Sequence, residues 1–312
     1  MTCSNTASTT GSYFVLNNNA ISTAAYRANG NVINAISTNA SQGSTQLIYN
    51  AGNTDNTVSM NNNVISNCTH SISSTGAYYA LYNNGISFAN LTMNGNSFSN
   101  HVVTAFNGPV HLLYNTRSIG NSISFTNNLI SASSFSFVNS GSFYGIYNNA
   151  GSTNTLLVNN NAFTGINSAV TSGSLHLIFN RGVITNTYLS QSFNSNLISN
   201  CNFSANAGGP FIGVYNSGVS SNLLSMSGNT INSSGWISTS SARYFIYNSG
   251  QSNTTSDLSN NMFVSCSNTM NTTGTLNCLL NTGATTLALN MSNCTFSNII
   301  NTGTVAFQTK VY

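Results

Sequence analysis

The chain has 312 residues, of which 40% are hydrophobic and only 2% are charged. Its formal net charge of +3 is too small to create an electrostatic footprint for nucleic acid or an anionic membrane. No apolar run reaches the roughly 18 residues that a transmembrane helix needs. The 17 Phe and 14 Tyr argue against a disordered chain, because disordered segments are usually charged and poor in aromatic residues.

A triplet of an aliphatic residue, an aromatic residue and Asn recurs along the chain, and its central position defines a repeat. In chain order the central residues are Leu16, Tyr49, Tyr82, Tyr114, Tyr147, Phe179, Tyr215, Tyr247, Leu280 and Tyr312. The steps between them are 32 or 33 residues, except for one step of 36 that places an insertion between Phe179 and Ile198. Such a fixed period is the signature of a repeat architecture.

A second apolar marker lies about half a period after the first, and an Asn almost always precedes it by two residues. These Asn residues are Asn31, Asn63, Asn96, Asn128, Asn161, Asn196, Asn229 and Asn261. Glycine keeps phase as well, six residues before the central aromatic residue at Gly43, Gly76 and Gly108, for example. Glycines in phase predict turns that need a positive φ or a close approach of two backbones.

The segments between the glycines have the composition and the length of β-strands. Residues 46–49, 78–82 and 243–247 read QLIY, YYALY and RYFIY, which are short runs of β-branched, aliphatic and aromatic residues. Helical periodicity is absent, which excludes helical repeats of similar length. A strand repeat of constant period predicts that each residue stacks on its counterpart in the next coil, roughly 4.8 Å away.

In such a stack the triplet Asn residues would form one continuous column. They are Asn50, Asn83, Asn115, Asn148, Asn180, Asn216, Asn248 and Asn281. Each amide can donate to the copy on one side and accept from the copy on the other, so the column satisfies buried polar groups. The Asn residues of the second marker would form another such column.

With these two Asn columns, residues 11–312 resemble the right-handed parallel β-helix family, whose Asn ladders occupy inward turns. We therefore expect an all-β, single-domain parallel β-solenoid of about nine coils, each with three or four short strands. The repeat continues in phase over residues 1–312, which predicts one continuous domain. Neither end resembles a cap, so we expect an uncapped fragment of a longer array.

The sequence contains no arrangement of acids that favours catalysis. Asp55 and Asp257 are the only acidic side chains, and they lie six repeats apart. Because glycoside hydrolysis needs two carboxyl groups close together, we expect no catalytic residue and no enzyme activity.

The histidines and cysteines also predict no cofactor and no metal site. His111 and His176 share one phase with Tyr144 between them, so they would lie roughly 9.6 Å apart in an aromatic column, too far to share a metal ion. Three of the six cysteines share another phase, where a small inward side chain is expected, and no two of them are in adjacent coils. They are Cys68, Cys201 and Cys266. We expect free buried thiols, because no histidine or basic neighbour that could activate a thiol is evident.

The aromatic residues of the triplet could form an exposed stripe along one face. They are Tyr49, Tyr82, Tyr114, Tyr147, Tyr215 and Tyr247, with Phe179 in the same column. Neighbouring residues of a strand point to opposite faces, so the stripe faces outward if the aliphatic residue of the triplet faces inward. A bend at the Asn would instead turn the tyrosines into the core, and the sequence leaves both alternatives open.

The Asn-, Ser- and Thr-rich repeat is similar to arrays of large secreted bacterial surface and adhesin proteins. This resemblance implies a non-catalytic structural or adhesive segment at the cell surface or outside the cell. Its partners would be further copies of the chain, joined end to end or laterally, or a carbohydrate or cell-surface ligand that is bound weakly. The alternative is a non-catalytic repeat part of a polysaccharide-active β-helix enzyme whose catalytic acids lie outside this segment.

Overall fold

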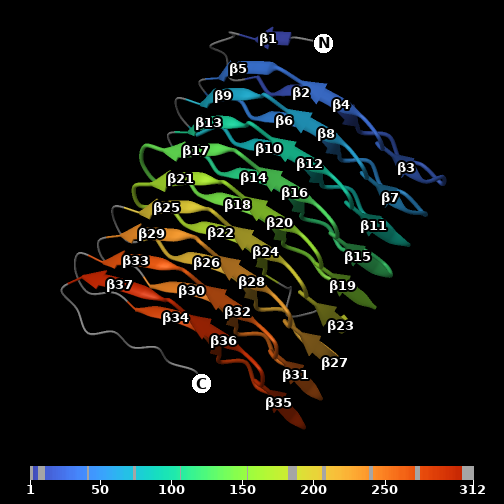
Figure 1. Ribbon diagram of the computed structural model, residues 1–312. Coiled ribbons are helices and arrows are strands. Elements are labelled where there is room, and N and C mark those ends of the chain that lie inside the picture. The colour runs from blue at the N-terminus through green and yellow to red at the C-terminus, as the bar shows by residue number, and fades with distance from the viewer. Residues whose placement is uncertain are drawn as a thin grey trace.

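The structure is a computed structural model that describes residues 3–5, 11–40, 42–72, 75–105, 107–152, 154–181, 188–205, 209–238, 242–270 and 275–303. All strand pairs in these residues are parallel, and four sheets run side by side along one axis (Figure 1). Each coil contributes one strand to each sheet. The predicted β-solenoid is therefore confirmed, with four strands in each coil and about nine coils.

Sheet I carries the aromatic triplets, and its strands end on the first Asn column. Its strands are β2 (Tyr13–Asn18), β6 (Thr45–Asn50), β10 (Tyr78–Asn83), β14 (Val110–Asn115), β18 (Phe143–Asn148), β22 (Leu175–Asn180), β26 (Phe211–Asn216), β30 (Arg243–Asn248) and β34 (Leu276–Asn281). The register corrects one expectation in the first coil. Asn17 pairs with Tyr49 and Asn18 with Asn50, so the triplet there is centred on Asn17 and not on Leu16. Tyr312 lies outside the described residues.

Sheet II follows sheet I along each coil and consists of short strands. They are β3 (Tyr26–Arg27), β7 (Val58–Ser59), β11 (Asn90–Thr92), β15 (Ser122–Ser124), β19 (Thr155–Leu157), β23 (Tyr188–Ser192), β27 (Ser220–Ser225), β31 (Thr255–Asp257) and β35 (Ala288–Asn290). The pairing of β23 with β27 shifts register between Tyr188 and Ser190. This irregularity lies within the segment where the longer repeat predicted an insertion.

Sheet III follows the second Asn column. Its strands are β4 (Val32–Asn34), β8 (Val64–Ser66), β12 (Ser97–Ser99), β16 (Leu129–Ser131), β20 (Ala162–Thr164), β24 (Leu197–Ser199), β28 (Thr230–Asn232), β32 (Met262–Val264) and β36 (Thr295–Ser297). A residue with positive φ stands at the bend on either side of this sheet, such as Asn62 at 55° and Asn67 at 54°. Asn and Gly tolerate this left-handed conformation better than other residues, which explains part of the high Asn content.

Sheet IV completes the coil and leads back to sheet I. Its strands are β1 (Cys3–Asn5), β5 (Ile36–Ala40), β9 (Thr69–Ile72), β13 (Val102–Ala105), β17 (Ser134–Phe137), β21 (Asn167–Val170), β25 (Asn202–Ala205), β29 (Gly235–Ser238), β33 (Ser267–Met270) and β37 (Ile300–Gly303). The glycines before sheet I allow close backbone approach and do not have positive φ. A Cβ on Gly108 would lie 1.6 Å from the carbonyl oxygen of Gly76.

The interior of the solenoid is one continuous apolar core. Aliphatic and aromatic residues of successive coils, such as Phe98 and Phe163, are fully buried in it. Arg243 departs from this pattern, because its charged side chain is buried at a position where the adjacent strands of sheet I carry Phe211 and Leu276. It donates to the side-chain oxygen of Asn268, while its Nη2 has no partner within the described residues.

Candidate functional site

The first Asn column is a hydrogen-bonded ladder, as predicted. Asn50 Nδ2 donates to Asn83 Oδ1 at 2.8 Å, and Asn83 Nδ2 donates to Asn115 Oδ1 at 2.9 Å. The same amide nitrogen also reaches the backbone carbonyl two residues later, as from Asn83 to Gly85 at 2.9 Å. Each fully buried amide is thus bonded to both neighbouring coils and to its own turn.

The second Asn column forms another ladder between sheets II and III. Asn63 Nδ2 donates to Asn96 Oδ1 at 3.0 Å, and Asn96 Nδ2 donates to Asn128 Oδ1 at 3.0 Å. The backbone N–H of Asn63 donates to the same Asn96 oxygen at 2.9 Å. The two ladders tie each coil to the next at two corners of the cross-section, and they are structural features.

The triplet tyrosines lie on the outer face of sheet I. The strands bend so that Leu47 and Ile48 both face the core, whereas Tyr49 stays on the outside and is half-buried. A second outer column, three residues earlier along each strand, packs beside the tyrosines. We call the two columns together the aromatic face, and its second column contains Tyr79, His111, Tyr144, His176, Ile212 and Tyr244.

The rings of the aromatic face stack on one another along the solenoid axis. The ring centroids of Tyr82 and Tyr114 are 4.9 Å apart, and those of His111 and Tyr144 are 4.7 Å apart with only 5° between the planes. Tyr147 is only 8% exposed. Other neighbouring pairs are tilted or edge-on, as Tyr215 with Tyr247 at 47° and Tyr147 with Phe179 at 65°, so the rings pack mainly against one another.

A groove runs along the outer face of sheet IV, across β17, β21, β25, β29 and β33, with a volume of about 480 Å³. Short hydroxyl and amide side chains line it together with apolar residues, among them Phe203, Trp236 and Ile237. We call it the hydroxyl groove. Its outward-facing lining is Ser134, Ser136, Asn167, Ala169, Asn202, Ser204, Gly235, Ile237, Ser267 and Thr269. Gly235 deepens the groove, because a Cβ there would come within 3.2 Å of both Ser267 Oγ and Asn202 Oδ1. Sequence reasoning missed this groove.

The two acids are far from one another. Asp55 precedes β7 and Asp257 lies on β31, and these strands are six positions apart in sheet II. At the usual strand spacing this corresponds to roughly 29 Å along the axis. The two carboxyl groups therefore do not form a pair.

Most of the histidines and cysteines lie in the columns that their positions in the repeat predicted. His111 and His176 are buried in the aromatic face with Tyr144 between them, and burial lowers the pKa of each to about 3. Cys201 and Cys266 are free thiols in the core, and burial raises the pKa of each to about 11.

Cys68 contradicts the expectation that no histidine lies near a buried thiol. His101 occupies the same column one coil later, and His70 follows Cys68 by two residues on β9. One ligand atom from each of the three side chains lies within 4.8 Å of the others, and all three residues are at most 1% exposed. The signal was present in the sequence, because the column that contains Cys68 also contains His101.

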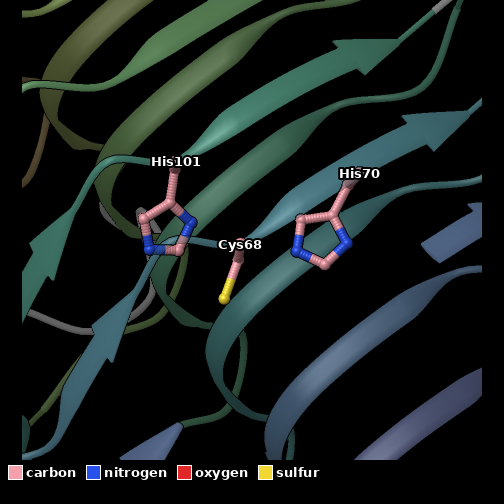
Figure 2. A group of neighbouring side chains, drawn as sticks. All are labelled: Cys68, His70 and His101. Carbon is pink, nitrogen blue, oxygen red and sulfur yellow. The ribbon is translucent and has the colours of Figure 1, made fainter. Parts of the chain in front are cut away.

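The hydrogen bonds of this cluster fix the orientation of the two imidazole rings and show which nitrogens have partners. His101 Nε2 lies 3.1 Å from the Ile65 carbonyl oxygen, so this nitrogen carries the proton and donates. His101 Nδ1 then accepts from the Tyr78 hydroxyl at 3.2 Å. His70 Nδ1 lies 2.6 Å from Thr38 Oγ1, while its buried Nε2 has no partner within the described residues. Figure 2 shows one nitrogen of each ring directed toward the space that they share with the Cys68 sulfur.

Burial keeps the cluster uncharged. It lowers the pKa of His70 to about 3, with a further contribution from His101, and that of His101 to about 4. It raises the pKa of the Cys68 thiol, an effect that a hydrogen bond from the Ile36 backbone opposes. Both histidines are therefore neutral near pH 7, which is the form that binds a metal ion.

The fold and the ladders define a parallel β-solenoid of stacked Asn-rich coils. A comparison with protein-family models, curated proteins and solved structures found no match to this chain. Among the described residues, no helix is long and apolar enough to cross a membrane.

Proposed function

We propose that the chain is a non-catalytic structural and adhesive segment of an extracellular bacterial surface protein, and that it binds carbohydrate weakly in the hydroxyl groove. The structural part rests on the continuous sheets and the two Asn ladders, which join each coil to the next. A solenoid of this kind can serve as a stalk or a filament, because every coil is joined to the next by the same sheets and the same Asn ladders.

The hydroxyl groove is the observation that carries the adhesive part. Its volume of about 480 Å³ lies within the range of known ligand sites. Ser, Thr and Asn side chains both donate and accept hydrogen bonds, which suits the hydroxyl groups of a sugar. The exposed Ile237 adds an apolar contact.

The direction of the groove favours a polymer over a small ligand. It crosses five neighbouring strands of sheet IV, which corresponds to roughly 19 Å along the axis. Near-absence of charge also makes contacts on this surface insensitive to salt, because no long-range attraction is there to be screened. Weak binding at one groove would become strong when many grooves act together.

The test compares binding of the chain to immobilised neutral polysaccharides by biolayer interferometry. Ala169→Trp fills the groove from β21, and we expect it to weaken binding at least tenfold. Ala162→Trp is the matched control, because it adds the same ring in the same coil but on sheet III, and it should bind as the parent chain does. If the two variants bind alike, or if no polysaccharide binds, the groove is not the adhesive site.

Self-association is the other adhesive mode, and sedimentation velocity measures it separately. A mass that rises with protein concentration and is unchanged in Ala169→Trp would identify contacts between copies of the chain outside the groove. If the chain is monomeric at all concentrations, self-association is excluded and carbohydrate binding is the adhesive mode that remains.

A further inference from the structure

The Cys68, His70 and His101 cluster has no part in adhesion, because all three side chains are buried inside the solenoid. Other positions of the same inward column carry residues that cannot act together in this way, such as Ile166, Cys201 and Ser234 in three successive coils. At Cys68 two imidazoles and one thiol meet instead. The core therefore contains a set of nitrogen and sulfur donors that apolar packing does not explain.

From this arrangement we propose that Cys68, His70 and His101 bind a transition metal ion of the Zn²⁺ type in the solenoid core. Thiolate and imidazole are the donors that zinc prefers in proteins. A zinc ion with bonds of about 2.0–2.3 Å needs donor atoms roughly 3.3–3.7 Å apart. The three donor atoms already lie within 4.8 Å of one another, so small side-chain movements close the site.

The outer hydrogen bonds of both imidazoles match those of metal-binding histidines. Such histidines donate their remaining N–H to a carbonyl or another oxygen, which fixes the tautomer and orients the ring. His101 does so through Nε2 to the Ile65 carbonyl, and His70 can do so through Nδ1 to Thr38 Oγ1. This arrangement leaves a lone pair on His101 Nδ1 and on His70 Nε2, which has no other partner.

The Tyr78 hydroxyl is hydrogen-bonded to one of the proposed donor atoms, His101 Nδ1. It lies 3.2 Å from His101 Nδ1 and now donates to it, so it would have to turn away when that nitrogen binds the ion. Coordination replaces the S–H bond of Cys68 by a sulfur–zinc bond and releases one proton to solvent. No redox change is involved.

The ion would join neighbouring coils. Cys68 and His70 belong to the coil of β9, whereas His101 immediately precedes β13 of the next coil. Because the site is closed to solvent, we expect the ion to enter while the chain folds.

The test uses the chain without a polyhistidine tag, refolded from denaturant with and without Zn²⁺ and then desalted over chelating resin. Elemental analysis should find one zinc ion per chain in the parent and in Cys201→Ser. Cys201 is the matched control, since it is buried at the same phase of another coil. Cys68→Ser and His70→Phe should contain none, with circular dichroism confirming that both are folded.

Two further measurements separate ligation from a packing role. Refolding with Co²⁺ should produce a sulfur-to-cobalt charge-transfer band in the parent and in Cys201→Ser only. Thr38→Val removes the support of His70 and should weaken zinc binding about 10–100-fold, whereas Thr38→Ser should restore it. A metal-free parent after refolding, or equal zinc in Cys68→Ser and Cys201→Ser, would overturn the proposal.

Discussion

The Asn ladder predicts a large loss of stability from a single substitution in its middle. Asn83 is fully buried and takes part in three hydrogen bonds: from Asn50 at 2.8 Å, to Asn115 at 2.9 Å and to Gly85 at 2.9 Å. Asn83→Ala removes all three. At about 1 kcal/mol net for each bond the loss is about 3 kcal/mol, and buried groups left without a partner add to it.

An exposed pair of the same chemistry is the control. Asn202 Nδ2 donates to Asn167 Oδ1 at 3.2 Å between neighbouring coils, but both side chains are exposed to solvent. Water replaces the lost bond there, so Asn202→Ala should change the free energy of unfolding by less than about 0.5 kcal/mol.

Urea denaturation followed by circular dichroism measures both variants. The midpoint for Asn83→Ala should fall while the slope of the transition is unchanged, and that for Asn202→Ala should not move. A cost for Asn83→Ala below about 1 kcal/mol, or equal to that of Asn202→Ala, would refute the view that the ladder stabilises the solenoid.

Three other predictions concern buried groups. The pKa of His111 and of His176 is lowered to about 3, below the unfolded value of 6.5, so the unfolded chain binds protons first and stability falls as the pH drops below 6.5. Between pH 7 and pH 5 the free energy of unfolding of the parent chain should fall by about 2 kcal/mol for each of these two histidines. The double variant H111Y/H176Y should not show this part of the loss, and urea titrations at the two pH values measure the difference. Arg243→Leu should raise the free energy of unfolding by about 2 kcal/mol, because removing a buried cation whose Nη2 has no partner among the described residues outweighs the lost hydrogen bond to Asn268, and an unchanged or lower urea midpoint would contradict this. Gly108→Ala should lower the thermal midpoint and cost about 2–3 kcal/mol, because its Cβ would overlap the Gly76 carbonyl oxygen, and a neutral effect would show that the turns are not so closely packed.

The fold could be predicted because a constant period decides which residues become neighbours. Once residues 32 or 33 apart are placed in register, the Asn ladders and the alternation of His111, Tyr144 and His176 follow without knowledge of the cross-section. The prediction for the first coil is wrong by one residue, because Asn occupies positions 17, 18 and 19 and the sequence does not show which of them belongs to the Asn column.

The cross-section itself could not be read from the period. Whether Tyr49 faces solvent depends on the bend that turns both Leu47 and Ile48 inward, and a strict alternation along the strand does not predict such a bend. The hydroxyl groove depends in the same way on how the outward-facing side chains of five coils are arranged on sheet IV, and on the missing side chain at Gly235. The column that contains Cys68 and His101 shows only part of the metal-ligand cluster, because His70 belongs to another phase.

The most direct test of the functional account is to measure binding and chain length of the same neutral polysaccharide in one experiment. The purified chain is incubated with the polymer, bound protein is measured, and the polymer mass is followed by light scattering after size exclusion. The account predicts binding that Ala169→Trp weakens and a polymer mass that does not change with time. A falling polymer mass would identify an enzyme and contradict the account, as would binding that filling the groove leaves unaffected.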